Sequence, residues 1–309
     1  MSETLILHHY DASPYAEKIR LMFGAKHLRW QSVLSPPQPP RPNVDPLSGG
    51  YRRIPIAQIG ADVFCDTFVI AQEVARLARA PELDPENASP EAKEILARAE
   101  GDVFFAAIGS VAPATLLGTL VRTVGPIGMV RFAIDRARMM QSATVKPAQG
   151  GKAREIMKAQ LADLEQRLAS EQDFLTGATP TIADFAAFHP LWLHVRSRRA
   201  PLDGRYARLL RWYERMEALG HGTREELAPE QAFEAARSGK PRPLPATAGE
   251  ADARIGRRVA IAPSDYGTDP VEGVLAAATD TRFVVARETD AFGTLHVHFP
   301  RRGFSLTER

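Results

Sequence analysis

The sequence predicts three successive parts: an α/β domain, an all-helical domain and a small all-β module. Residues 1–80 open with a strand, a helix and a second strand, which is how a βαβ unit begins. Residues 89–219 carry apolar side chains at helical spacing almost throughout. Residues 253–309 contain short runs of β-branched and aromatic residues separated by turn sequences, which indicates a small β-barrel or β-sandwich.

Length and composition agree with several domains and exclude some functions. The chain has 309 residues, whereas one domain usually has about 100–200. The 39 Lys and Arg residues nearly balance the 37 Asp and Glu residues, so no net charge attracts nucleic acid or an anionic membrane. The single cysteine excludes an intrachain disulfide, and no apolar run is long enough to span a membrane. We therefore expect a cytoplasmic protein that binds neither nucleic acids nor membranes.

In the first domain, apolar periodicity and turn residues predict the order of the elements. Strands are expected at 4–10 and 29–34, a helix that includes 15–23, a hairpin formed by 52–60 and 63–65, and a helix at 66–78. Proline is concentrated in residues 35–42, where we expect a rigid surface loop; a polyproline ligand is the alternative.

The helical domain is expected at 88–222. Ser89 followed by Pro90 is typical of a helix start, and further amphipathic helices are predicted at 154–169, 180–195 and 205–219. Thr181 and Asp184 have the spacing of a capping box. Residues 223–252 are expected to hold a short helix ending at Gly239 and a proline-rich linker over 239–249.

The last module contains four predicted strands, at 257–263, 271–278, 282–288 and 294–300. Its charges are nearly balanced and it has no dense aromatic and basic surface, so nucleic-acid binding is weakly supported. Its expected roles are to cover a cleft, to support dimerisation or to bind a partner that the sequence does not identify.

Four short motifs occur in a characteristic order: Ser13-Pro14 after the first strand, Ile54-Pro55 before the third, Asp66-Thr67 at the next helix, and the capping box at Thr181. In this order and spacing, residues 4–222 resemble the glutathione transferase superfamily, especially serine-type members such as the theta, zeta and omega-like classes. The resemblance implies a thioredoxin-like domain at 1–80 and an all-α domain after it.

In the resemblance, Ser13 is the catalytic residue. Free N–H groups and the helix dipole favour an anion at a helix N-terminus, and the Ser13 hydroxyl would donate a hydrogen bond to the glutathione thiolate. Tyr10 is the alternative, because tyrosine-type members place their hydroxyl near the end of the first strand. A structural alternative is that Ser13 only caps the helix.

Three further elements would hold glutathione. Ile54, before a cis Pro55, would pair through its backbone with the cysteinyl part, and Asp66 and Thr67 would hold the γ-glutamyl end. Arg53, with Arg52, would meet the glycyl carboxylate. The structural alternatives are an edge strand at Pro55, a capped helix at Asp66 and a solvated arginine pair.

The remaining candidates concern the electrophile pocket, cysteine and histidine. Pocket candidates between the domains, which are also candidate core residues, are Phe104, Phe105, Ile108 and Trp192. Cys65 is expected to be a packing residue. The pairs His8-His9 and His296-x-His298 lack neighbouring acidic or cysteine ligands, so we expect no metal and a solvated strand face.

The resemblance therefore implies a glutathione transferase that conjugates the glutathione thiolate to an apolar small-molecule electrophile. Glutathione is the co-substrate, and a homodimer is compatible with the family. Two alternatives stay open: a glutathione-dependent isomerase or lyase for a specific metabolite, and a non-catalytic binding protein with the same fold.

Overall fold

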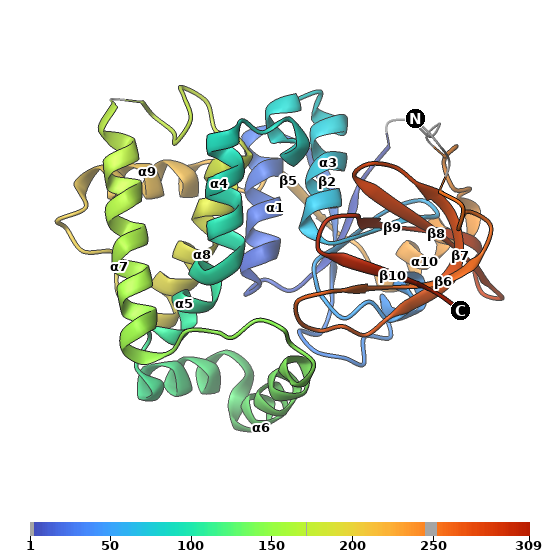
Figure 1. Cartoon of the computed structure of the whole chain (residues 1–309), viewed down its shortest axis with the longest axis horizontal. Coiled ribbons are helices and arrows are strands. Elements are labelled where there is room, and N and C mark those ends of the chain that lie inside the picture. Colours follow the sequence, from blue (N-terminus) through green and yellow to red (C-terminus); the bar gives the residue numbers. More distant parts are fainter. Residues whose placement is uncertain (1–2, 171, 245–251) are drawn as a thin grey trace.

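A computed structural model describes residues 3–170, 172–244 and 252–309. The predicted fold class is confirmed: a thioredoxin-like part, a helical part and extra C-terminal strands follow one another, with the helices on one side of the molecule and the C-terminal strands on the other (Figure 1). The N-terminal elements are β1 (Ile6–His9), α1 (Pro14–Ala25), β2 (Arg29–Leu34), α2 (Asp45–Ser48), β3 (Ile56–Ile59), β4 (Asp62–Cys65) and α3 (Thr67–Ala78).

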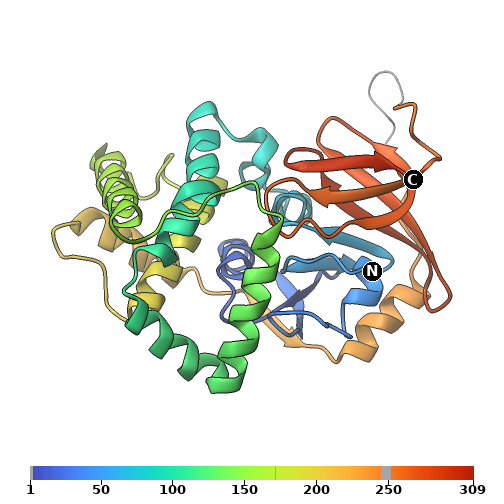
Figure 2. The same ribbon diagram turned by 60° about the horizontal axis from the view of Figure 1, so that its bottom comes forward.

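The helical part begins where the sequence predicts, with Ser89 capping α4 by accepting a hydrogen bond from the Ala92 N–H at 3.2 Å. Its helices are α4 (Pro90–Arg98), a π-helical segment (Ala99–Val103), α5 (Phe104–Gly109), α6 (Pro113–Gln141), α7 (Gly150–Arg167), α8 (Ile182–Arg198) and α9 (Ala207–Ala218). Short 3₁₀ turns lie at Pro81–Leu83, Pro85–Asn87 and Leu168–Ser170. Helix α6 is broken at Gly125, which has a φ of 73° and is followed by Pro126. Figure 2 shows the two halves of this helix (green) at a steep angle to each other.

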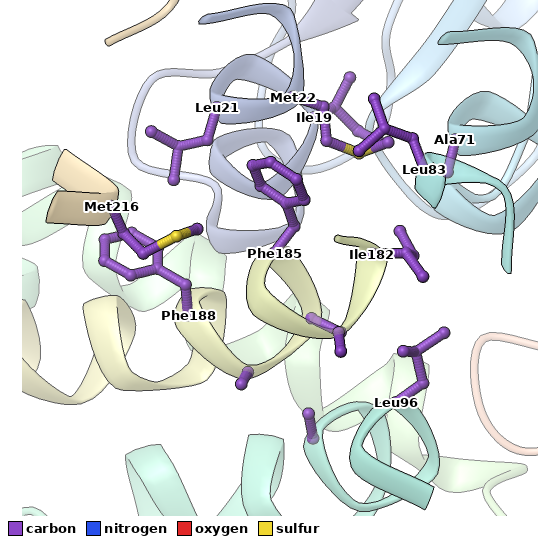
Figure 3. Close-up of a cluster of buried hydrophobic side chains, with 14 of the residues drawn as sticks. Ile19, Leu21, Met22, Ala71, Leu83, Leu96, Ile182, Phe185, Phe188 and Met216 are labelled. Carbon is purple, nitrogen blue, oxygen red and sulfur yellow. The ribbon is translucent and has the colours of Figure 1, made fainter. Parts of the chain in front are cut away.

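Helix α1 packs against both the thioredoxin-like part and the helical part. Its residues Ile19, Leu21 and Met22 are buried, and they lie in one hydrophobic cluster with side chains of α3, α4, α8 and α9 (Figure 3). Phe185 of α8 points toward α1 in this cluster. The helix that begins just after Ser13 is therefore held rigidly by the core.

The C-terminal segment contains β5 (Thr223–Glu226), α10 (Pro229–Ser238), β6 (Arg258–Pro263), β7 (Val271–Ala278), β8 (Arg282–Thr289), β9 (Gly293–Pro300) and β10 (Phe304–Glu308). Strands β5 and β10 were not expected. Strand β10 lies beside β6, so the last strand of the module returns to its first. The short helix is present and ends at Gly239 as predicted, whereas residues 245–249 of the predicted linker lie outside the described residues.

The ten strands of the described residues form one sheet, in the order β10-β6-β7-β8-β9-β4-β3-β1-β2-β5. The module joins the thioredoxin-like part where β9 pairs in parallel with β4, with Asp62 opposite His296. Both parts share one hydrophobic cluster, which includes Val63 and Cys65 of β4 and Val297 of β9. The β module is thus continuous with the N-terminal sheet.

This pairing corrects one expectation about histidine. His298 is only 5% exposed, and its Nε2 lies 2.8 Å from the Asp62 carboxylate. The prediction of a solvated strand face is wrong for this residue, because β9 is an interior strand of the larger sheet. It is also wrong for His8 and His9, which are fully buried in β1.

An ionic cluster reinforces the same junction. The buried Glu73 carboxylate of α3 accepts hydrogen bonds from Arg282 of β8 at 2.9 Å and from Arg242 at 3.0 Å. Burial opposes ionisation of Glu73, but the two arginines outweigh it and hold the pKa of this carboxyl at about 2.

This pKa predicts acid sensitivity. Because the folded pKa lies below the ordinary value of 4.5, the stabilisation is complete above that value and is lost as the pH falls toward 2. We expect Glu73 to account for a loss of about 3 kcal/mol in the free energy of unfolding over that interval. Urea unfolding from pH 7 to pH 3 should show a shallower acid slope for Glu73→Gln than for the wild type. Equal slopes would contradict the assignment.

Among the described residues, no single helix is long and apolar enough to cross a membrane. The segments Pro90–Gly109 and Pro113–Arg122 are long and apolar enough only when they are taken together, and they meet at a bend of 95°.

Candidate active site

One cavity of about 1400 Å³ brings together residues from all three parts of the chain. Every residue that the sequence predicts for a catalytic, binding or pocket role lines it: Tyr10, Ser13, Arg53, Ile54, Pro55, Asp66, Thr67, Phe104, Phe105, Ile108 and Trp192. The helical part and the C-terminal module supply the walls facing α1 and α3.

Ser13 is the N-cap of α1. Its Oγ accepts a hydrogen bond from the Ala16 N–H at 3.2 Å, and the following Pro14 brings no N–H of its own. A hydroxyl that accepts one hydrogen bond keeps its proton free to donate another. Tyr10 lines the same cavity, and its carbonyl accepts a hydrogen bond from the Ser13 N–H at 3.0 Å. The cap and a donor role are therefore compatible in Ser13.

The Ile54-Pro55 peptide bond is cis, as the resemblance implies. Ile54 precedes β3 and lines the cavity. Within the part of the chain that the structure describes, neither the N–H nor the C=O of Ile54 has a hydrogen-bond partner. The cavity wall thus offers one free donor and one free acceptor of the main chain, which suits an extended peptide.

Asp66 and Thr67 lie at the N-terminus of α3. Asp66 is the N-cap, with a φ of 89°, and its carboxylate accepts a hydrogen bond from the Phe68 N–H at 2.9 Å. Burial raises the pKa of Asp66, although the nearby Arg53 guanidinium opposes the shift. The N-terminus of a helix of this length favours an anion at Thr67, and Asp66 is an acceptor for an ammonium group.

Arg53 and Arg52 are not a solvated pair, so that alternative is wrong. The Arg53 side chain is 18% exposed and binds the Asp265 carboxylate of the C-terminal module. It also donates to the Tyr266 carbonyl at 2.6 Å. Arg52 is 10% exposed and pairs with Asp135 of α6 at 2.5 Å.

Phe104, Phe105, Ile108 and Trp192 all line the cavity. Sequence reasoning missed further apolar lining residues of α6, which are Leu116, Leu120, Val124, Phe132, Met139 and Met140. Trp192 is 5% exposed, and the Arg196 guanidinium lies 4.6 Å from the centre of its ring. These apolar side chains can contact an apolar or aromatic molecule.

Sequence reasoning also missed two tyrosines. The Tyr15 ring packs on Phe104 with ring centroids 4.6 Å apart, and the Tyr266 ring packs edge-on against Phe105. Burial, followed by Tyr266, raises the pKa of Tyr15 well above its ordinary value, so Tyr15 stays neutral. Tyr266 lies in a turn sequence, Ser-Asp-Tyr-Gly, whose pattern signals only a turn.

None of the described residues that line the cavity is a cysteine or a histidine. Cys65 is fully buried in β4, and burial raises the pKa of its thiol well above the ordinary value, so it is a packing residue. Among the described residues, no group of three His, Cys, Asp or Glu side chains is placed to hold a metal ion.

Comparison with known proteins decides the family. The model of the glutathione S-transferase N-terminal domain matches residues 7–82, and that of the C-terminal domain matches residues 131–215. A GST-like protein from Pseudomonas syringae has a solved structure and is 30% identical, with a TM-score of 0.72 over 99% of this chain and 100% of that chain. The chain belongs to the glutathione transferase superfamily.

Within this superfamily, the match to the Pseudomonas syringae protein includes the C-terminal strands, because it covers nearly the whole of both chains. A glutathione S-transferase from Methylobacillus flagellatus KT, solved with glutathione bound, is 20% identical with a TM-score of 0.45 over 70% of this chain and 99% of that chain. A search of curated proteins found no match.

Proposed function

We propose that the protein is a glutathione transferase that activates the glutathione thiol and joins it to an apolar electrophile. The observation that supports this most is one shared cavity, which is lined by a hydroxyl at a helix N-terminus, by the free peptide group of Ile54 and by apolar side chains. The γ-glutamyl end of glutathione would lie at Asp66 and Thr67, and its cysteinyl part would pair with Ile54.

In this proposal, Ser13 donates a hydrogen bond to the glutathione sulfur and stabilises the thiolate over the thiol. The α1 N-terminus acts in the same direction, because its partial positive charge favours the anion. Lowering the thiol pKa raises the fraction of reactive thiolate near neutral pH. The thiolate then attacks the electrophile held near Phe105 and Trp192, forming a carbon–sulfur bond while the leaving group departs with its electron pair.

Titration with glutathione tests the proposal. We expect saturable heat of binding in calorimetry and a thiolate absorbance band in the ultraviolet that appears below the pH at which free glutathione ionises. Turnover of a generic aromatic electrophile would distinguish a broad transferase from an isomerase or lyase that uses the same thiolate on one metabolite. Absence of glutathione binding at millimolar concentration would leave a non-catalytic role for the fold. The proposal places this reaction in the cytosol, where thiols are kept reduced.

A further inference from the structure

The loop between β6 and β7 reaches from the C-terminal module into the cavity. Asp265 and Tyr266 of this loop line the same cavity as Ile54 and Asp66. Tyr266 is 8% exposed, and its ring packs edge-on against Phe105 of α5 at 5.5 Å. The module is therefore a wall of the candidate active site.

The loop supplies a counter-charge to the Arg53 guanidinium and occupies one of its amino groups, whereas the buried Nε has no hydrogen-bond partner among the described residues. One amino group of Arg53 binds both the Asp265 carboxylate and the Tyr266 carbonyl. The flat face of the guanidinium lies 4.1 Å from the centre of the Tyr266 ring, and its other amino group is 4.0 Å from the Asp66 carboxylate. Arg53, the cation that the sequence predicts for the glycyl carboxylate of glutathione, already holds a carboxylate of its own chain.

Asp265 is fixed in this position from two sides. Its carbonyl accepts a hydrogen bond from the Thr144 N–H at 2.8 Å, and the Gly267 N–H donates to the Met139 carbonyl of α6 at 3.1 Å. On the other side, the Ser264 N–H donates to the Gly303 carbonyl in the β9–β10 turn at 3.0 Å. These main-chain bonds hold the Asp265 carboxylate at Arg53.

Neighbouring guanidinium groups are engaged as well. Arg52 pairs with Asp135 at 2.5 Å. Arg41, a buried residue of the proline-rich loop, donates hydrogen bonds to the Pro36 carbonyl at 3.0 Å and to the Arg52 carbonyl at 2.9 Å. Arg41 cannot replace Arg53 as a carboxylate ligand without losing these buried partners.

We propose that Asp265 is a specificity-determining residue for the thiol: by occupying Arg53, it makes the site indifferent to the terminal carboxylate of glutathione. This inference rests on the proposed function. A second carboxylate at the same guanidinium would meet the charge of Asp265, which cancels the attraction of Arg53. The thiols that suit this site are γ-glutamyl-cysteinyl compounds, and an uncharged C-terminal end binds as well as a charged one.

Two probes test this inference: glutathione and its monoethyl ester at the glycyl carboxylate. Calorimetry should give Kd values for the wild type that agree within about 3-fold, because the ester removes a charge that Arg53 does not bind and adds only one ethyl group. In Asp265→Asn, Oδ1 can still accept the hydrogen bond from Arg53, but the counter-charge is removed. The positive charge of Arg53 then attracts a terminal carboxylate, and glutathione should bind roughly 10-fold more tightly than the ester. Asparagine keeps the Oδ1 atom that accepts the Tyr266 N–H at 2.9 Å, so the loop geometry should be retained.

Asp269→Asn is the matched control. Asp269 lies on the same loop and is 64% exposed, and its carboxylate is 3.8 Å from Arg52 rather than at Arg53. This variant removes one loop charge but should leave the two Kd values within about 3-fold of each other. A preference for glutathione in both variants would indicate a general effect of loop charge and overturn the role of Asp265.

The wild-type comparison decides the inference even where a variant fails to fold. A wild-type preference for glutathione of roughly 10-fold or more would show that the terminal carboxylate is read, and would overturn the inference while the proposed function stands. Loss of that preference in Arg302→Gln would assign it to Arg302, which also lines the cavity. If neither glutathione nor its ester binds to the wild type or to any of these variants, the proposed function is overturned, and the inference with it.

Discussion

Replacing Ser13 with alanine should lower kcat/KM for glutathione conjugation roughly 100-fold at neutral pH, because it removes a donor aimed at a developing anion. The pKa of the bound thiol should rise, so the activity should recover partly as the pH increases. Ultraviolet absorbance of the thiolate, followed against pH with and without the substitution, measures this shift directly.

The control for Ser13→Ala is Ser89→Ala. Both serines precede a proline, and each accepts a hydrogen bond from the N–H three residues later at 3.2 Å, but Ser89 lies outside the cavity. Each substitution should cost about 1 kcal/mol of stability through loss of a helix cap. Only Ser13→Ala should change the thiol pKa. An unchanged thiolate band in Ser13→Ala would transfer the donor role to Tyr10, for which Tyr10→Phe is the next test.

Replacing Asp184 with alanine should reduce the free energy of unfolding by about 4 kcal/mol, because three buried donors lose their acceptor. The Asp184 carboxylate accepts hydrogen bonds from the Leu175 N–H at 2.8 Å, the Trp212 Nε1–H at 2.9 Å and the Thr181 N–H at 2.9 Å. It is fully buried and ties the start of α8 to α9 and to the loop before α8.

Urea unfolding measures this effect, and Asp184→Asn refines it. Asparagine retains Oδ1, which accepts from Leu175 and Trp212, but presents an amide group to the Thr181 N–H. Its loss of stability should therefore lie between those of the wild type and Asp184→Ala. Asp203→Ala, which removes an exposed carboxylate, should hardly move the midpoint. A midpoint for Asp184→Ala equal to that of Asp203→Ala would refute the role of the capping box.

Local patterns predicted most of the elements because the helices and strands have amphipathic periodicity. The missed strand β5 has the sequence Thr-Arg-Glu-Glu and pairs only with β2 at the end of the sheet. It buries no apolar face, so no alternation signals it. The junction of β4 with β9 was also not predicted, because a pairing between distant strands leaves no local pattern.

The candidate site was predictable where it coincides with the starts of helices and with the Ile54-Pro55 element. Ser13, Ile54, Asp66 and Thr67 line one cavity, although their roles toward glutathione remain proposals. Asp265 was not predictable, because an aspartate in a turn serves turn geometry equally well. Its pairing with Arg53 depends on how the C-terminal module sits on the sheet, which only the tertiary structure determines.

The continuous sheet has a consequence for the order of synthesis. Asp62 of β4 and His298 of β9 are hydrogen-bonded, yet they are 236 residues apart. The thioredoxin-like strands therefore emerge from the ribosome long before β9, the partner of β4. Strand β4 stays an unpaired edge while the helical part is synthesised. Such an edge can pair with another chain, and contacts of long sequence separation form slowly. Nascent chains of this protein should need protection from aggregation until the final strands emerge.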